Sequence, residues 1–109
     1  MLEVYLDQVS GKQLIKETIC MGGINSLCER YYLGNDLHRE DGPAVTWYED
    51  DKKASESYFL RNKLHRENGP SIIHYKDGTI GKERWYLNGR ELDILEEMVI
   101  RGLKMEKLI

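Results

Sequence analysis

Short stretches in which apolar and polar residues alternate run through most of the chain, separated by turn-forming residues. The stretches at 29–33, 44–49, 56–60, 71–76 and 83–87 are rich in aromatic and β-branched residues, which favour strands. Gly, Asn, Asp and Pro, which favour turns, lie between them. The pattern predicts a mainly β (α+β) fold, an antiparallel meander of β-hairpins.

The pattern recurs with a period of 27 residues. Residues 29–42 read ERYYLGNDLHREDG, residues 56–69 read ESYFLRNKLHRENG, and residues 83–89 read ERWYLNG. Self-similarity at a fixed spacing is typical of repeat architectures, whose terminal units are often atypical. We therefore expect hairpin repeats over residues 29–92, preceded by a degenerate hairpin unit at 1–28.

Turn signals divide each repeat into two strands. Asn88 and Gly89 form the kind of pair that favours a two-residue hairpin turn, because both tolerate positive φ. Pro43 and its counterpart Pro70 each follow a glycine and lack an N–H, so neither can continue a central strand. The chain is therefore expected to run up and down through short antiparallel hairpins.

The aligned aromatic residues form two columns, one on each face of the predicted sheet, because side chains alternate along a strand. One column must build the core and the other is left partly exposed, but alternation does not say which. Exposed aromatic side chains tend to mark interaction surfaces, as do nearby charged turns. The candidate partner contacts are Tyr31, Tyr58 and Trp85 from one column, and the acidic turn of Glu49, Asp50 and Asp51.

Residues 93–109 form the predicted C-terminal α-helix. Asp93 and Glu96 have the spacing of a capping box, and apolar residues follow at intervals of three and four. Gly102 offers an alternative end to the helix at Arg101. We expect the helix to cover an open face or edge of the sheet, and docking to a partner or a second copy is the alternative.

Composition narrows the classes of function. The chain has 109 residues and a net charge of −3, which predicts one domain over residues 1–109. No segment is basic, so direct nucleic-acid binding is not expected. Neither a membrane span nor a signal peptide is evident, which predicts a cytoplasmic protein. Cys20 and Cys28 do not have the usual spacing of zinc ligands, and no metal or cofactor is expected.

Three strings carry a resemblance to a known repeat: LHREDGPAV at 37–45, LHRENGPSI at 64–72 and ERWYLNGREL at 83–92. They resemble tandem WY-x-NG-x-x-HR-x-DGPA repeats found in many copies in bacteriophages and large DNA viruses. Those repeats are loosely similar to membrane-occupation-and-recognition-nexus (MORN-type) β-hairpin repeats. The resemblance covers residues 29–92 and implies a hairpin array and a viral source, but no catalytic residue.

The repeated His-Arg pairs are the most chemically suggestive residues. In one interpretation, His38, Arg39, His65 and Arg66 hydrogen-bond to turn carbonyls and nearby carboxylates, and so hold the repeats together. In the other, they bind a small ligand or a nucleotide in a cleft. Burial of both arginines against carboxylates or carbonyls would exclude the second interpretation.

No nucleophile elbow, P-loop or glycine-rich phosphate cradle is evident in the sequence. We therefore expect a small non-enzymatic protein-binding module. The viral resemblance suggests an inhibitor of a host enzyme or defence complex, like an anti-CRISPR protein, whose partner in the host cytoplasm is a protein or ribonucleoprotein. The alternatives are a ligand-binding protein that uses the His-Arg turns, and a structural homo-oligomer formed by joining sheet edges.

Overall fold

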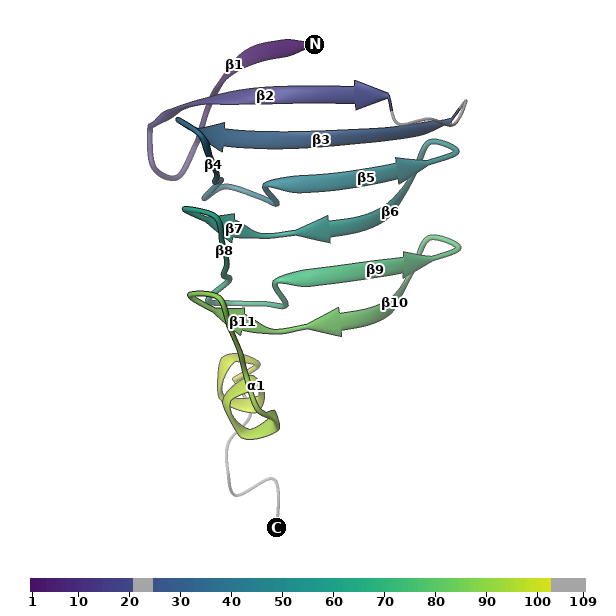
Figure 1. Cartoon of the computed structure of the whole chain (residues 1–109). Helices are drawn as coiled ribbons and strands as arrows, with labels where there is room; N and C mark the ends of the chain where they lie inside the picture. The colour runs from purple at the N-terminus through teal and green to yellow at the C-terminus, as the bar shows by residue number, and fades with distance from the viewer. Residues whose placement is uncertain (21–24, 103–109) are drawn as a thin grey trace.

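The computed structural model describes residues 1–20 and 25–102, and most of its strands form one long antiparallel layer (Figure 1). In spatial order, the layer consists of β1 (Leu2–Leu6), β2 (Gln13–Cys20), β3 (Ser26–Leu33), β5 (Val45–Glu49), β6 (Lys52–Ser57), β9 (Ile72–Lys76) and β10 (Thr79–Arg84). Spatial neighbours are mostly sequence neighbours, as in a meander. The predicted mainly β architecture is therefore confirmed.

Short hairpins lie side by side at one end of the long strands (Figure 1). They are made by β4 (Asp36–Leu37), which pairs with the end of β3, by β7 (Phe59–Leu60) with β8 (Lys63–Leu64), and by β11 (Tyr86–Leu87) with β12 (Arg90–Glu91). The second and third lie outside the main ladder, because β6 ends before Tyr58 and β10 before Trp85. The predicted continuous strands at 56–60 and 83–87 are therefore interrupted at the aromatic residue.

Backbone hydrogen bonds join the successive short hairpins. The N–H of Arg39 donates to the carbonyl of Phe59 at 3.1 Å, and 27 residues later the N–H of Arg66 donates to the carbonyl of Tyr86 at 3.2 Å. These bonds run from the segment that follows one hairpin to the first strand of the next hairpin. They hold the two His-Arg segments in equivalent positions.

The turns at both ends of the strands use the left-handed region. Asn88 and Gly89 have φ values of 49° and 82°, as their sequence predicts. Asp50 and Asp51 adopt φ values of 51° and 63° without a glycine, which costs roughly 1–2 kcal/mol per residue. The side-chain amide of Asn25 donates to Asp50 Oδ1 at 2.9 Å and supports this turn.

The aromatic column that includes Tyr31 and Trp85 builds the core. These two side chains are only 5% and 6% exposed. The opposite column, represented by Tyr32 and Phe59, is half-buried. The face that carries Tyr31 and Trp85 is therefore the core face at the two ends of this column, which alternation alone could not decide.

The helix α1 (Ile94–Ile100) begins with the predicted capping box between Asp93 and Glu96. It ends at the C-cap Arg101, followed by Gly102 with φ 77°, so the alternative end is the one adopted. The rest of the predicted helix, 103–109, lies outside the described residues. No residue of α1 is buried, so it covers less of the sheet than expected. No helix in the described part of the chain is long and apolar enough to cross a membrane.

Candidate functional site

The first His-Arg turn, residues 38–43, folds around the side chain of Arg39. The guanidinium carbon lies 4.1 Å from the ring centroid of Tyr31, and Nη1 donates to the carbonyl of Pro43 at 3.2 Å. On its other side, a Cβ added at Gly42 would lie only 2.8 Å from Arg39 Cζ. The arginine is therefore held between an aromatic ring and a glycine backbone, where no other residue type leaves it room.

The second His-Arg turn, residues 65–70, repeats this arrangement. Arg66 lies 4.1 Å from the centroid of Tyr58 and donates to the carbonyl of Pro70 at 3.2 Å. A Cβ added at Gly69 would lie 2.7 Å from Arg66 Cζ. Three contacts therefore agree between the turns, so the two arginines occupy closely similar positions.

The histidines of the turns connect each turn to the following hairpin. His38 Nδ1 accepts a hydrogen bond from the N–H of Arg61 at 3.0 Å, and His65 Nδ1 accepts one from the N–H of Asn88 at 2.9 Å. A nitrogen that accepts cannot carry a proton, so the geometry places the proton of each neutral ring on Nε2. Both imidazoles act here as structural links, in line with the structural interpretation of the sequence.

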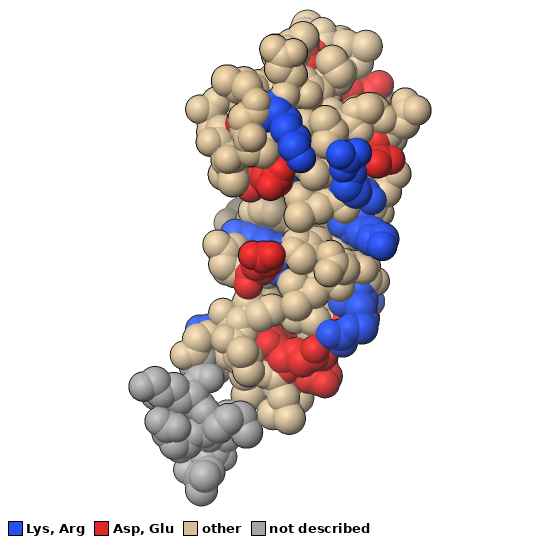
Figure 2. Space-filling view, turned by 90° about the vertical axis from the view of Figure 1, so that its left-hand side faces the viewer, with Lys and Arg blue, Asp and Glu red and all other residues tan. Residues whose placement is uncertain are grey.

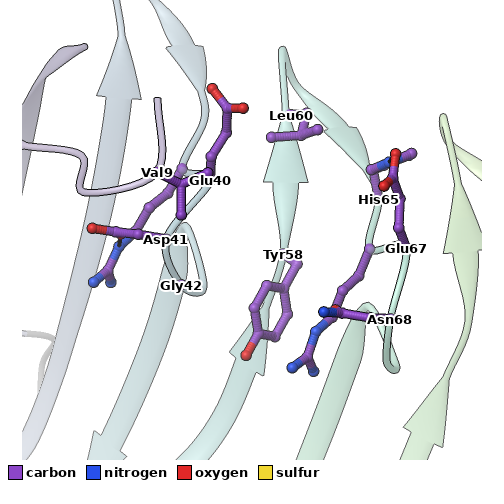
Figure 3. Close-up of a pocket in the computed structure, with 11 residues that line it drawn as sticks. Val9, Glu40, Asp41, Gly42, Tyr58, Leu60, His65, Glu67 and Asn68 are labelled. Carbon is purple, nitrogen blue, oxygen red and sulfur yellow. Dashed lines mark hydrogen bonds and ion pairs between the residues drawn. The ribbon is translucent and has the colours of Figure 1, made fainter. Parts of the chain in front are cut away.

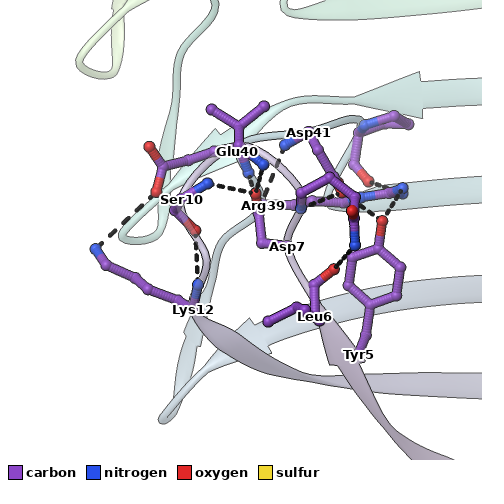
Figure 4. A network of polar contacts seen from close by, with 11 residues as sticks. Tyr5, Leu6, Asp7, Ser10, Lys12, Arg39, Glu40 and Asp41 are labelled. Carbon is purple, nitrogen blue, oxygen red and sulfur yellow. Dashed lines mark hydrogen bonds and ion pairs between the residues drawn. The ribbon is translucent and has the colours of Figure 1, made fainter.

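A carboxylate from the N-terminal loop occupies the first turn (Figure 4). Asp7 is fully buried, and its Oδ2 accepts from the N–H groups of Glu40 at 2.6 Å and Asp41 at 3.4 Å. Its Oδ1 accepts from the N–H groups of Val9 and Ser10 at 2.9 and 3.0 Å. One side chain therefore closes its own loop and also attaches that loop to a turn more than 30 residues away.

A second carboxylate and a tyrosine complete the contacts of the first turn. Asp41 accepts from Nε of Arg39 at 2.5 Å and also accepts from the hydroxyl of Tyr5. Nη2 of Arg39 donates to that hydroxyl at 3.1 Å, and the rings of Tyr5 and Tyr31 meet edge to face at 4.9 Å. Arg39 is therefore enclosed by two aromatic rings, a carboxylate and a carbonyl.

Both carboxylates of the first turn are stabilised in their charged form. Burial alone would raise the pKa of Asp7, but the N–H groups of Ser10, Glu40 and Val9 outweigh burial and hold the pKa below 3.8. Burial likewise opposes ionisation of Asp41, and hydrogen bonds from Gln8, Tyr5 and Arg39 again lower its pKa. Both side chains are anions at neutral pH.

The second turn has the same frame, by which we mean the arginine held between a tyrosine ring and a glycine, but it lacks these partners. Asn68 stands where the first turn has Asp41, so Arg66 lacks the adjacent carboxylate that Arg39 has. None of the described residues accepts a hydrogen bond from the backbone N–H of Glu67 or Asn68. Glu67 and Asn68 are both exposed residues that line the cleft.

An open cleft of about 530 Å³ separates the two turns (Figure 3). Tyr58 and Leu60 lie between the turns in this view, with Val9 and Asp41 on one side and Asn68 on the other. Apolar and charged groups therefore line the same space, and the second turn forms one of its walls.

The surface along the hairpin side carries charges of both signs. Figure 2 shows this side, where lysine and arginine side chains follow one another down the molecule with acidic groups beside them. Ion pairs also lie along the short hairpins: Arg61 in the β7–β8 turn pairs with Asp36 of β4 at 3.7 Å, and Glu91 of β12 pairs with Arg84 at 2.9 Å. The side is therefore not a uniformly basic surface of the kind that follows a phosphate backbone.

Two of the aromatic partner contacts expected from the sequence need correction. Tyr31 and Trp85 are buried because an arginine covers each ring, so they offer no surface to a partner. Tyr58 is half-buried and lines the cleft, so it remains a candidate. The acidic residues Glu49, Asp50 and Asp51 are exposed, but their turn lies at the opposite end of the strands from the short hairpins (Figure 1).

The ligand-binding interpretation of the His-Arg residues is not supported at the first turn. His38 is 4% exposed, and Arg39 is enclosed by carboxylate and carbonyl oxygens. His65 is committed to the link with Asn88. Arg66 also lines the cleft, and its one hydrogen bond within the described residues is the bond of Nη1 to the Pro70 carbonyl, so the ligand-binding interpretation stays a prediction for the second turn.

The C-terminal helix takes the place of a third turn. The N–H of Leu92 donates to the carbonyl of Trp85 at 2.8 Å, as the N–H of His65 donates to Tyr58 at 3.0 Å. Arg101, at the end of α1, lies 4.7 Å from the Trp85 ring centroid and pairs with Glu83 at 3.2 Å. An arginine from the helix therefore covers the third aromatic ring.

Within the part of the chain that the structure describes, no group of three or more His, Cys, Asp or Glu residues is arranged to hold a metal ion. Cys20 is exposed and Cys28 is buried, and neither forms a disulfide. The cleft between the turns is therefore the feature on which a functional assignment rests.

Comparisons with protein-family models, with curated proteins and with solved structures find no match for this chain. The resemblance to viral hairpin repeats thus stays a prediction from sequence, and the function has to be argued from the cleft and its two turns.

Proposed function

We propose that the chain is a small non-enzymatic protein-binding module that receives a loop of a partner in the cleft between its His-Arg turns. One observation carries the proposal: the first turn already serves as the docking surface of a polypeptide loop, through Asp7 and Tyr5. The second turn has the same frame and borders an open cleft. A surface that holds a loop of its own chain can hold a loop of another.

The dimensions and lining of the cleft suit a protein segment. Its volume of about 530 Å³ is within the ordinary range of binding pockets. Val9 and Leu60 provide apolar contact area, while Arg66 provides charge and hydrogen-bond donors. This combination of an apolar surface with a few directed polar groups is typical of sites that bind with specificity.

The biological use is a separate part of the proposal. The resemblance to viral repeats suggests that the partner is a host enzyme or defence complex, which the module inhibits by occupying one of its surfaces. The net charge of −3 and the mixed charges on the hairpin side favour a protein surface over free nucleic acid.

Affinity capture with two matched variants tests the binding role. Val9 lies at the rim of the cleft and Val99 lies on α1, and they are 70% and 68% exposed, so tryptophan at either position should leave the fold intact. We expect a partner from bacterial lysate to be retained by the unchanged chain and by Val99→Trp, but lost with Val9→Trp. Capture that is unaffected by Val9→Trp, or no stoichiometric capture at all, would refute the cleft as the binding site.

A second candidate, self-association through sheet edges, is favoured by the outer strand β1. Leu2, Val4 and Leu6 alternate along this edge strand and are 66%, 70% and 54% exposed. An exposed apolar edge strand can add a strand from another copy. Sedimentation of the chain over a wide concentration range tests this, with Val4→Lys as the variant expected to abolish any dimer. A monomer at all concentrations would rule it out.

A further inference from the structure

The backbone amides of Glu67 and Asn68 in the second turn are the counterparts of the two amides that bind a carboxylate in the first turn. Glu67 and Asn68 follow Arg66 as Glu40 and Asp41 follow Arg39, and the arginine contacts of the two turns agree in distance. In the first turn, the two amides donate to one carboxylate oxygen at 2.6 and 3.4 Å. Since the frames match, the second turn presents the same pair of donors.

The charge balance of the second turn also calls for an anion. In the first turn, Arg39 pairs with the Asp41 carboxylate, and Asp7 adds another negative charge nearby. In the second turn, none of the described residues forms an ion pair with Arg66. The carboxylate of Glu67 is 84% exposed and lies near His65 instead. A carboxylate that enters the cleft would meet a guanidinium and two amides that are not paired with any carboxylate of the described residues.

We propose that the second His-Arg turn binds the aspartate of a Tyr-x-Asp loop from a partner protein, as the first turn binds Tyr5 and Asp7 of its own chain. This inference rests on the proposed binding function and names the chemistry of the partner. The aspartate accepts from the amides of Glu67 and Asn68 and lies beside Arg66. The tyrosine packs against Tyr58, the counterpart of Tyr31.

An aspartate at the start of a tight loop fits this site better than other anions. Oδ1 of Asp7 is bound by the amides of its own loop, and this directs Oδ2 at the two amides of the turn. A glutamate, one methylene longer, could not make both sets of bonds with the same backbone. Glu40 and Glu67 flank the cleft and disfavour a polyanion such as nucleic acid.

A peptide that copies the natural occupant of the first turn tests the inference. The probe is residues 4–12, VYLDQVSGK, closed into a ring by a disulfide between added terminal cysteines. It is titrated into the full chain labelled with ¹⁵N, and the amide resonances of Glu67 and Asn68 are followed. We expect both resonances to shift and saturate, while those of Glu40 and Asp41, already occupied by Asp7, stay in place.

Two matched controls distinguish recognition of the carboxylate from non-specific binding. The same peptide with Asp7→Asn should bind roughly tenfold or more weakly, because it loses the charge-assisted hydrogen bonds. In the chain, Asn68→Asp supplies the acceptor that Asp41 offers to the Tyr5 hydroxyl and the Gln8 amide in the first turn, so this variant should bind the peptide at least as tightly as the unchanged chain. Equal binding of both peptides, loss of binding to the Asn68→Asp chain, or unmoved Glu67 and Asn68 resonances at millimolar peptide would overturn the inference.

The two proposals fail in distinguishable ways. If the peptide does not bind but a partner is still captured through the rim residue Val9, the cleft binds protein and the aspartate chemistry is wrong. If the peptide binds with the expected preferences but no partner is captured, the carboxylate site stands and the proposed function falls.

Discussion

The two His-Arg turns are built on one frame but are filled differently. In both, an arginine lies 4.1 Å from a tyrosine ring and against a glycine. Both turns border the cleft, but the first is closed by Asp7, Tyr5 and Asp41, whereas no described carboxylate pairs with the arginine of the second. The comparison shows that the arginine, tyrosine and glycine arrangement forms with contacts to its own unit and the next hairpin. The contacts of the carboxylates are additional and occur at the first turn.

This separation gives the turns different parts in stability. Contacts around the first turn join the N-terminal hairpin to the rest of the sheet, so losing them frees a whole segment. Contacts around the second turn are those of the frame alone. Substitutions at matched positions should therefore have unequal effects, and the following predictions run from the largest expected difference to the smallest.

The largest difference between the turns is expected when Asp7 of the first and Asn68 of the second are each replaced by alanine. Asp7→Ala leaves the N–H groups of Glu40 and Asp41 without their buried acceptor and should lower the free energy of unfolding by about 3 kcal/mol. The Asn68 side chain forms no hydrogen bond with any described residue, so Asn68→Ala should change the free energy of unfolding by less than about 0.5 kcal/mol. Urea unfolding followed by tryptophan fluorescence measures both. Equal losses would mean that the second turn is also filled.

The glycines of the two turns offer a second matched pair. Gly42→Ala and Gly69→Ala each force a methyl group against an arginine, at 2.8 and 2.7 Å from Cζ. Arg39 is held by Asp41 and cannot move away, so the first substitution should cost about 2 kcal/mol. Arg66 can swing into the cleft, and the second should cost less than about 1 kcal/mol. The same unfolding assay applies, and the reverse order would contradict the described filling.

Acid should lower the free energy of unfolding through the carboxylates of the first turn. The loss should be smaller than that caused by Asp7→Ala, because a protonated side chain stays in place. Folding lowers the pKa of Asp7 and Asp41 below 3.8 despite their burial, so their contribution is fully present above that pH. It is lost as the pH falls through the lower pKa values of the folded chain. Unfolding between about pH 6 and about pH 3 should show this loss, and Asp7→Asn should reduce it. If the free energy of unfolding of Asp7→Asn depended on pH as that of the unchanged chain does, the pKa of Asp7 would not differ between the folded and unfolded states.

The smallest effect is expected when the second turn is given the residue of the first. Asn68→Asp should raise the free energy of unfolding by about 0.5 kcal/mol, because the new pair with Arg66 is partly exposed to solvent. The reverse substitution, Asp41→Asn, should cost more than this gain, because Asp41 also holds Tyr5 and Gln8. Chemical denaturation of both variants measures the asymmetry, and a destabilised Asn68→Asp would show that Arg66 is already paired.

The repeated part of the fold could be predicted from the sequence because each of its signals is local. The hairpin turn at Asn88 and Gly89, and the capping box at Asp93, depend on neighbouring residues alone. The strand interruptions at Tyr58 and Trp85 could not be predicted, because they arise where the chain leaves the main ladder for a short hairpin.

The contacts of Asp7 with the first turn could not be predicted from local sequence patterns. Asp7 lies 33 residues before Glu40, in a loop that carries no copy of the repeat. The one available clue was the difference between Asp41 and Asn68 in otherwise matching strings. Likewise, alternation placed Tyr31 and Trp85 on a common face but could not show that arginines cover them.

The link from each histidine to the next hairpin has a consequence for how such a chain can lengthen. Because His38 and His65 bind their following hairpins in the same way, a further 27-residue unit inserted between them would meet matching joints on both sides. The N-terminal loop could still fill only the first turn, so each inserted unit would add one more vacant cleft. Length would then set valency, and avidity for a partner with several acidic loops could be gained by duplication without any new contact chemistry.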